Sequence, residues 1–233
     1  MSKEFIEAYL KETTEIAMNV NRDDINKAIE ILFEAWKNNK KIFTIGNGGS
    51  ASTASHFAAD LAKTVSHGSS DREVKEGKKG FIAFCLNDNP ALTTAWINDS
   101  GWENVYFGQL SSLLDENDVL LILSVHGGSG WSGNIVKAME LAKKRNARIV
   151  GFAGYDGGML KKLADACIVV PKDSTPHVEG FHSVLQHLIV FRLKEMIQKY
   201  SNNSVLEKLQ NIGSQCLESV KINQLLDEFP IKK

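Results

Sequence analysis

The chain has 233 residues, of which 43% are hydrophobic and 24% charged, and its formal net charge at pH 7 is −1. This length suits one sizeable α/β domain with helical additions, and the balanced charge indicates neither a nucleic-acid-binding protein nor a membrane-surface protein. The sequence shows no apolar run of membrane-spanning length and no signal peptide. The cysteines are scattered, without metal-type spacing, so we expect a cytoplasmic protein.

Two amphipathic helices are predicted within residues 1–38. Hydrophobic residues recur at helical spacing from Phe5 to Leu10 and again from Ile25 to Trp36. Asp23 or Asp24 would cap the second helix. Because both apolar stripes need a surface to bury against, we expect these helices to take part in subunit packing.

Short apolar runs alternate with helical segments along the rest of the chain, which predicts a doubly wound parallel sheet. The expected strands comprise residues 42–45, 81–86, 119–125, 148–153 and 166–170. The helices between and after them are expected near residues 51–63, 103–114, 135–145, 158–164 and 177–200, with a mobile loop at 66–80. We therefore divide the chain into a helical pair at 1–38, an α/β domain at 39–200 and a C-terminal helical extension at 201–233.

The first strand runs into a glycine-rich turn, Gly46-Asn47-Gly48-Gly49-Ser50, which opens an Ala-rich helix. Glycines let backbone N–H groups approach a ligand, and the helix dipole favours negative charge at this end. One turn further along, His56 and Asp60 are four residues apart and share a face of the helix. An anion-binding turn beside a His/Asp pair is the stretch best suited to chemistry.

A second glycine- and serine-rich loop, residues 124–134, follows the third strand. Both loops fall at carboxyl ends of strands, where open α/β sheets bind their ligands. Later, Glu179 and His187 lie on roughly one side of the helix at 177–200, and His182 and Gln186 share that side. Spacing does not decide which of these four faces the site; we expect His182 in the core, and His67 and His177 on the surface.

Taken together, these motifs resemble the sugar isomerase (SIS) domain family, in particular its phosphoheptose isomerase branch. The resemblance covers roughly residues 5–198 and implies a three-layer αβα sandwich around a five-stranded parallel sheet of flavodoxin-like type. It also implies a homotetramer with sites at subunit interfaces. The stretches that carry it are Gly46-Asn47-Gly48-Gly49-Ser50, His56-Phe57-Ala58-Ala59-Asp60-Leu61, Asp156-Gly157-Gly158 and Thr175-Pro176-His177-Val178-Glu179.

The resemblance implies a ketose–aldose isomerase that acts on sedoheptulose 7-phosphate, with Zn²⁺ as cofactor. By position, the family's zinc ligands become His56, Asp60, Glu179 and His187. Asp60 or Glu179 would act as the base and His187 as the acid. The substrate-binding candidates are Asn47, Gly48, Gly49, Ser50, Asp99, Ser124, His126 and Ser129.

Three features depart from the family pattern. Asp60 stands where the family has Glu, Glu179 stands where it has Gln, and the 124–134 loop is longer than the family's phosphate loop. The longer loop leaves open an isomerase of a different anionic sugar. A non-catalytic scaffold that binds a sugar phosphate is the alternative outside enzymes, although four residues able to bind a metal favour an enzyme.

Overall fold

The structure, a computed structural model, describes residues 2–65 and 79–228, and the side chains of residues 2–65 and 79–202. The chain divides into two compact units, Met1–Lys194 and Glu195–Lys233. His67 and all but the last two residues of the expected 66–80 loop lie outside the described residues.

Five parallel strands form one sheet, and their order is β2-β1-β3-β4-β5. The register sets Phe43 beside Phe84 on one side and Leu120 on the other. The strands β1, β3 and β4 are almost wholly buried, as expected of parallel strands with both faces covered. The predicted five-stranded parallel sheet is confirmed, with strands β1 (Lys41–Gly46), β2 (Ile82–Cys85), β3 (Val119–Leu123), β4 (Arg148–Ala153) and β5 (Ala166–Val169).

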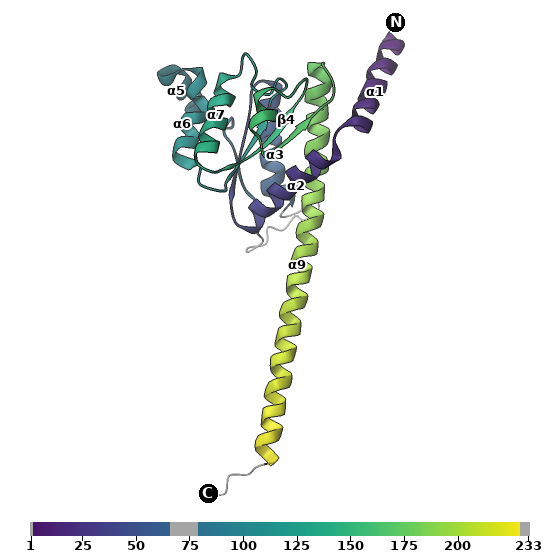
Figure 1. The fold of residues 1–233 in the computed structure, drawn as a ribbon, viewed down its shortest axis with the longest axis vertical. Helices are drawn as coiled ribbons and strands as arrows, with labels where there is room; N and C mark the ends of the chain where they lie inside the picture. The colour runs from purple at the N-terminus through teal and green to yellow at the C-terminus, as the bar shows by residue number, and fades with distance from the viewer. Residues whose placement is uncertain (1, 66–78, 229–233) are drawn as a thin grey trace. The chain divides into compact units, whose positions relative to one another are not determined.

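Helices cover both faces of this sheet, which confirms the predicted three-layer sandwich (Figure 1). On one face, α6 to α8 bury a core that includes Phe43, Leu120 and Ile149. On the other face, Phe152 meets Phe57 of α3 edge-on, and α9 packs beside α3. The α-helices are α1 (Ser2–Asn19), α2 (Arg22–Lys37), α3 (Gly49–Ala59), α5 (Pro90–Ser100), α6 (Val105–Leu113), α7 (Gly133–Lys144), α8 (Gly158–Leu163) and α9 (Thr175–Glu228).

Two local predictions about helix ends are wrong. Asn21, rather than either aspartate, caps α2, because it directly precedes the first helical residue and its side chain accepts from the backbone N–H groups of Asp23 and Asp24. The late helix does not end at Tyr200 but continues to Glu228. Residues 201–228 contain no proline and a single glycine, so little in that stretch stops a helix.

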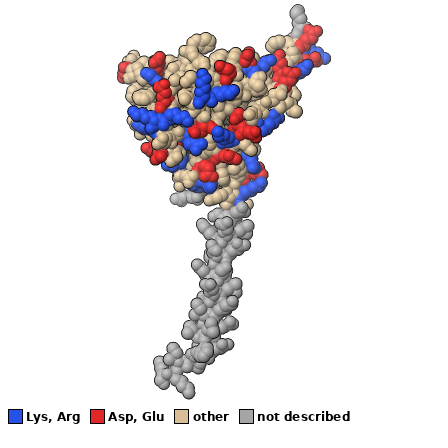
Figure 2. All heavy atoms as spheres, viewed as in Figure 1, with Lys and Arg blue, Asp and Glu red and all other residues tan. Residues whose placement is uncertain are grey.

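The apolar stripe of α1 stays uncovered within the described part of the chain. Phe5, Ile6 and Leu10 are 71%, 54% and 59% exposed. On the face of the molecule drawn in Figure 2, Lys and Arg side chains are interspersed with Asp and Glu. Among the described helices, none combines the length and the apolar character needed to cross a membrane.

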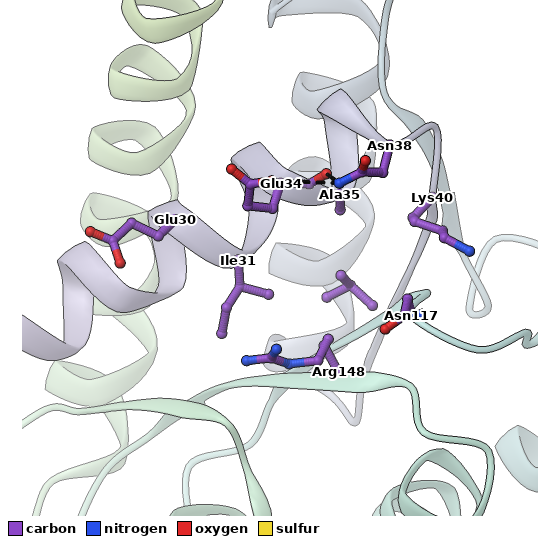
Figure 3. A pocket seen from close by; sticks show the side chains of 9 residues that line it. Glu30, Ile31, Glu34, Ala35, Asn38, Lys40, Asn117 and Arg148 are labelled. Carbon is purple, nitrogen blue, oxygen red and sulfur yellow. Dashed lines mark hydrogen bonds between the residues drawn. The ribbon is translucent and has the colours of Figure 1, made fainter.

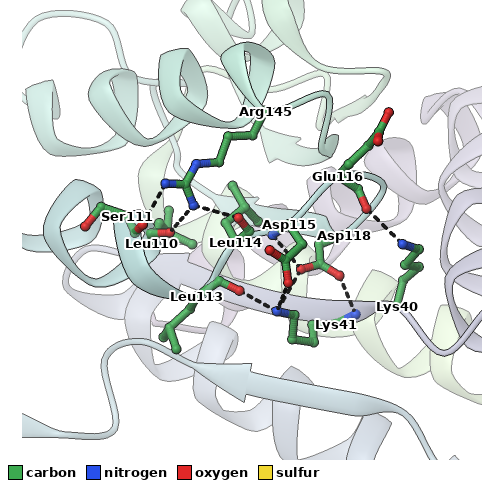
Figure 4. Close-up of polar contacts among 10 residues, drawn as sticks. All are labelled: Lys40, Lys41, Leu110, Ser111, Leu113, Leu114, Asp115, Glu116, Asp118 and Arg145. Carbon is green, nitrogen blue, oxygen red and sulfur yellow. Dashed lines mark hydrogen bonds and ion pairs between the residues drawn. The ribbon is translucent and has the colours of Figure 1, made fainter.

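A buried carboxylate ties the start of β1 to the end of α6. Asp118 accepts the backbone N–H of Lys41 on one oxygen and that of Asp115 on the other, both at 2.9 Å (Figure 4). The Lys41 ammonium lies 3.3 Å from the second oxygen. Nearby, Arg145 donates to the carbonyls that end α6, with bonds of 3.3, 2.6 and 2.7 Å to Leu110, Ser111 and Leu114.

We expect Asp118→Ala to lower the free energy of unfolding by about 2–3 kcal/mol, because two backbone N–H groups lose their acceptor and the Lys41 ammonium loses a partner. Glu116→Ala, which removes an exposed carboxylate two residues away, should change it by less than about 0.5 kcal/mol. Urea denaturation followed by circular dichroism compares the two, and equal stability of both variants would contradict the assignment.

Candidate active site

A cavity of about 190 Å³ opens at the carboxyl ends of the strands. It lies where the loops after β1 and β3 meet, which is the point at which the strand order reverses and where such sheets bind ligands. Its walls come from three segments of the chain that are far apart in sequence. The lining residues are Asn47, Ser50, Ser124, Val125, His126, Ser129, Trp131, Ser132, Thr175 and Glu179.

Glu179 reaches this cavity because the start of α3 carries no side chain in its way. A Cβ atom on Gly49 would lie 2.8 Å from the carboxylate carbon and both carboxylate oxygens of Glu179. Gly48, at φ +57°, provides the turn into the helix. Neither glycine lines the cavity itself; they shape the turn that lets a carboxylate of α9 lie against α3.

The two loops are joined by side-chain amides. Asn47 donates to Asn134 at 3.1 Å and accepts from it at 2.9 Å. The hydroxyl of Tyr106 lies 3.0 Å from the Asn47 side-chain oxygen and also contacts the Gly46 carbonyl. Burial raises the pKa of Tyr106 to about 12, so the phenol stays protonated at neutral pH. Through its two bonds to Asn134, the amide of Asn47 joins the two loops, and it also lines the cavity.

Aromatic side chains form the rim of the cavity on the side of the 124–134 loop. Gly127, at φ +58°, brings the loop so close to the start of α8 that a Cβ there would overlap the Gly157 carbonyl. The ring of His126 then lies 4.4 Å from Tyr155 and 5.5 Å from Trp131, between ring centroids. Trp131 is 83% exposed. Nothing in its sequence pattern had marked it as a site residue.

A second cluster lies further along α3 and α9. His56, Asp60 and His187 place one ligand atom each within 4.8 Å of one another. One oxygen of Asp60 is 3.4 Å from His56 Nε2 and 3.9 Å from His187 Nε2. His187 Nδ1 lies 2.9 Å from the Ser183 carbonyl, so in the neutral imidazole the proton is on Nδ1 and the lone pair is on Nε2. Two imidazole nitrogens and a carboxylate oxygen form a His/Asp site that fits a divalent metal ion.

Two residues that sequence analysis left open or missed complete the surroundings of Asp60. Gln186 donates to one carboxylate oxygen at 3.1 Å, and the Thr64 hydroxyl donates to the other at 2.9 Å. Gln186 shared the predicted face of its helix, but spacing could not show that it is the residue in contact with Asp60. Thr64 is four residues from Asp60 and could have been found as a helical neighbour.

The structure does not bring every predicted site residue together. Glu179 lies at the cavity and not in the group of three. Asp99 is exposed on α5, accepts a hydrogen bond of 2.7 Å from Asn98, and does not line the cavity of its own chain. His177 is buried, because α1 folds over it and stacks Tyr9 on its ring at 4.0 Å; the prediction of a surface residue is wrong.

His182 is a core residue, as predicted, and is 1% exposed. Its ring packs edge-on against Phe152, and its Nε2 lies 3.2 Å from the Ala153 carbonyl. Burial lowers the pKa of His182 to about 4, against an ordinary value of 6.5. The neutral ring is therefore the form that the folded protein holds at neutral pH.

This burial predicts a loss of stability in acid. Between pH 6.5 and about pH 4 the unfolded chain binds a proton at His182 that the folded protein does not, so the free energy of unfolding falls with decreasing pH. The full loss is about 3 kcal/mol, since one pKa unit corresponds to about 1.4 kcal/mol. His182→Leu should lack this component. Urea midpoints of both proteins at several pH values measure the difference, and parallel pH profiles would rule the explanation out.

A larger cavity, of about 590 Å³, lies at the opposite edge of the sheet (Figure 3). It is lined by α2 and by the residues at which β3 and β4 begin, Val119 and Arg148. Ligands of open parallel sheets bind at the carboxyl ends of the strands, and this cavity is at the amino ends. We therefore assign the active site to the smaller cavity.

The fold, the two ligand loops and the His/Asp site define a SIS-domain protein of the sugar isomerase class, and a model of the SIS domain matches residues 6–70. Phosphoheptose isomerase from Helicobacter pylori is 36% identical over 81% of this chain and 91% of that protein. Lincomycin biosynthesis protein LmbN from Streptomyces lincolnensis is 36% identical over 77% of this chain but only 65% of that protein. The structure of phosphoheptose isomerase GmhA from Neisseria gonorrhoeae superposes with a TM-score of 0.72 at 25% identity, over 84% of this chain and all of that one. The chain belongs to the phosphoheptose isomerase family and is an aldose–ketose isomerase by class.

Proposed function

We propose that the protein interconverts sedoheptulose 7-phosphate and D-glycero-D-manno-heptose 7-phosphate through an enediol(ate). The observation that carries this proposal is that the cavity and the His/Asp site lie along the same two helices. Ser50 and His56 are six residues apart on α3, about 9 Å along its axis. An extended seven-carbon sugar phosphate would place its phosphate among the serines of the cavity and its C1–C2 end beside Glu179, on the side that leads along α3 and α9 toward the His/Asp site.

The phosphate would bind among hydroxyl groups. Ser50, Ser124 and Ser129 line the cavity and can donate to phosphate oxygens. The 124–134 loop also leads into the start of α7, whose N-terminal end favours negative charge. A neutral set of donors at a helix start binds a phosphate without requiring a lysine or arginine.

We assign the transfer of the carbon-bound proton to Glu179. Isomerisation requires a base that removes a proton from C1 of the ketose and returns it to C2. Glu179 faces the cavity, whereas both oxygens of Asp60 already accept hydrogen bonds. His187 would not carry the second proton while its Nε2 binds a cation, because its Nδ1 donates to the Ser183 carbonyl. Solvent in the cavity would move that proton from the hydroxyl oxygen on C1 to the oxygen on C2.

The residues of the His/Asp site fit Zn²⁺, and we propose His56, Asp60 and His187 as its ligands. When bound there, the cation would supply Lewis acid chemistry that polarises the substrate carbonyl. The three side chains come from α3, its continuation and α9, so the packing of these helices sets the spacing of the ligands.

We further propose a cytoplasmic homotetramer with active sites at subunit interfaces. Support comes from the exposed stripe of α1 and from the edge strand β2, on which Phe84 is exposed. In such an assembly Asp99, which is exposed and does not line its own cavity, would reach the sugar hydroxyls of a neighbouring site. Light scattering after size-exclusion chromatography measures the mass, and a monomer would contradict this arrangement.

The experiment that tests the function is NMR of sedoheptulose 7-phosphate with the protein in D₂O, with and without a chelator. We expect deuterium to enter next to the carbonyl, an aldose signal to appear, and both to be lost with the chelator. Turnover that survives complete metal removal would contradict the metal-assisted reaction. No exchange with the zinc-loaded protein would contradict this substrate.

A second candidate is the same chemistry on a different anionic sugar, and the rim of the cavity favours it. His126 and Trp131 of the 124–134 loop, with Tyr155 against His126, present aromatic surface on this side of the cavity. The same NMR assay with a panel of phosphorylated pentoses, hexoses and heptoses separates the two candidates. A hexose phosphate turned over at a higher kcat/KM than the heptose would establish the second.

A further inference from the structure

Both carboxylate oxygens of Asp60 are occupied by donors from within the protein. The Thr64 hydroxyl donates to Oδ1 at 2.9 Å, and the Gln186 amide donates to Oδ2 at 3.1 Å. An ionised carboxylate only accepts hydrogen bonds, so the N–H end of the Gln186 amide must be the end that faces it. The oxygen that receives the Gln186 bond is the same oxygen that faces His56 and His187.

The backbone contributes to this arrangement. At Asp60 the α3 helix widens into a π-helical turn, η1 (Asp60–Thr64), in which the N–H of Val65 bonds to the Asp60 carbonyl. Such turns are rare and are frequently found at functional sites. Asp60 also has a short side chain with a single methylene group. The carboxylate of Asp60 can therefore reach few positions, and a donor from α9 can hold it in one of them.

Packing alone does not account for a glutamine at position 186. Gln186 is 0% exposed, and its side-chain oxygen has no hydrogen-bond partner among the described residues. A buried amide with an unpaired acceptor is costly, and a leucine or methionine there would avoid that cost. The bond to Asp60 is what the amide provides that an apolar side chain cannot.

We propose that Gln186, assisted by Thr64, is a positioning residue that orients Asp60 as a ligand of the bound cation. This inference rests on the proposed function, because it assigns a purpose to the His/Asp site. Gln186 holds Oδ2 toward the two imidazole nitrogens, and Thr64 prevents the carboxylate from rotating about its last bond. Neither side chain lines the cavity, so both would act through Asp60.

The central experiment measures Zn²⁺ affinity by competition with a chromophoric chelator in the full-length protein. Gln186→Met keeps the volume and removes the donor, and we expect it to weaken zinc binding about 10- to 100-fold, the range found when residues that support metal ligands are changed. In an Asp60→Ala background the same substitution should change the affinity less than about twofold, because the carboxylate that it orients is gone. Equal zinc affinity of Gln186→Met and the parent protein would overturn the proposal.

Threonine substitutions provide a matched pair. Thr64→Val removes the donor to Oδ1 and should weaken zinc binding. Thr53→Val removes a hydroxyl of α3 whose hydrogen bond, among the described residues, goes to the Gly49 carbonyl, and it should leave zinc binding unchanged. Equal effects of the two valine variants would show a general response of the helix and would contradict the positioning role. Thermal unfolding of each variant without metal confirms that it is folded.

A metal-free measurement separates this inference from the proposed function. The side-chain amide of Gln186, assigned by the signal that Gln186→Met lacks, should shift in the ¹H–¹⁵N spectrum when Asp60 is changed to Ala. If this shift occurs but the parent protein binds no zinc, the Gln186–Asp60 contact exists but has no cation to serve. That result would contradict both the proposed metal-assisted function and this inference. If zinc binds and the signal does not move, the inference alone fails.

Discussion

Glu179→Gln is expected to reduce kcat by about 10²- to 10⁴-fold, the contribution usual for a positioned acid–base group. The amide keeps the size and the hydrogen-bonding shape of the side chain but cannot accept a proton from C1. Since Glu179 lies against Gly49 at the cavity and outside the His/Asp group, its neutralisation should leave zinc affinity within about twofold of the parent. The variant would therefore lose isomerase activity but still bind zinc.

Solvent deuterium exchange at the carbon next to the carbonyl measures this step directly. Glu140→Gln, the same change on an exposed position of α7, is the control and should exchange at the parental rate. Substantial exchange by Glu179→Gln, together with none by an Asp60→Asn variant that still binds zinc, would transfer the role of carbon base to Asp60.

The elements that sequence analysis found are those that local patterns determine. An unbroken, short apolar run such as Val119–Leu123 favours a strand covered on both faces, and the glycines at 46–49 favour a turn before a helix. Because both ligand loops follow strands of one parallel sheet, their meeting at one edge was predictable without knowing a single contact. This is why most of the cavity lining was in the predicted set.

The contacts that sequence analysis could not give are those that join distant segments. Gln186 and Asp60 are 126 residues apart, and Asn47 and Asn134 are 87 apart. Helical spacing placed Gln186 on the same side as His187, but the rotation of α9 against α3 decides which side chain touches Asp60. His177 shows the same limit in another form, since its burial depends on α1 folding back across the start of α9.

Asp60→Ala is expected to weaken zinc binding by about a hundredfold or more, because it removes one of three ligands whose joint affinity depends on all of them. Activity at low zinc concentration should fall in proportion. The defect lies in affinity, so saturating zinc should restore part of the activity, since His56 and His187 still hold the ion and Glu179 still faces the substrate. The same zinc excess should do nothing for Glu179→Gln.

Isothermal titration with Zn²⁺, followed by isomerase assays over a range of zinc concentrations, measures both effects. Asp23→Ala, which removes an exposed carboxylate from the first turn of α2, serves as the matched control and should behave as the parent does. Rescue of Asp60→Ala but not of Glu179→Gln would separate the carboxylate that holds the cation from the one that moves the proton. If Asp60→Ala bound zinc as tightly as the parent, Asp60 would not be a ligand. The hydrogen bonds that it accepts from Gln186 and Thr64 would then have no role in metal binding.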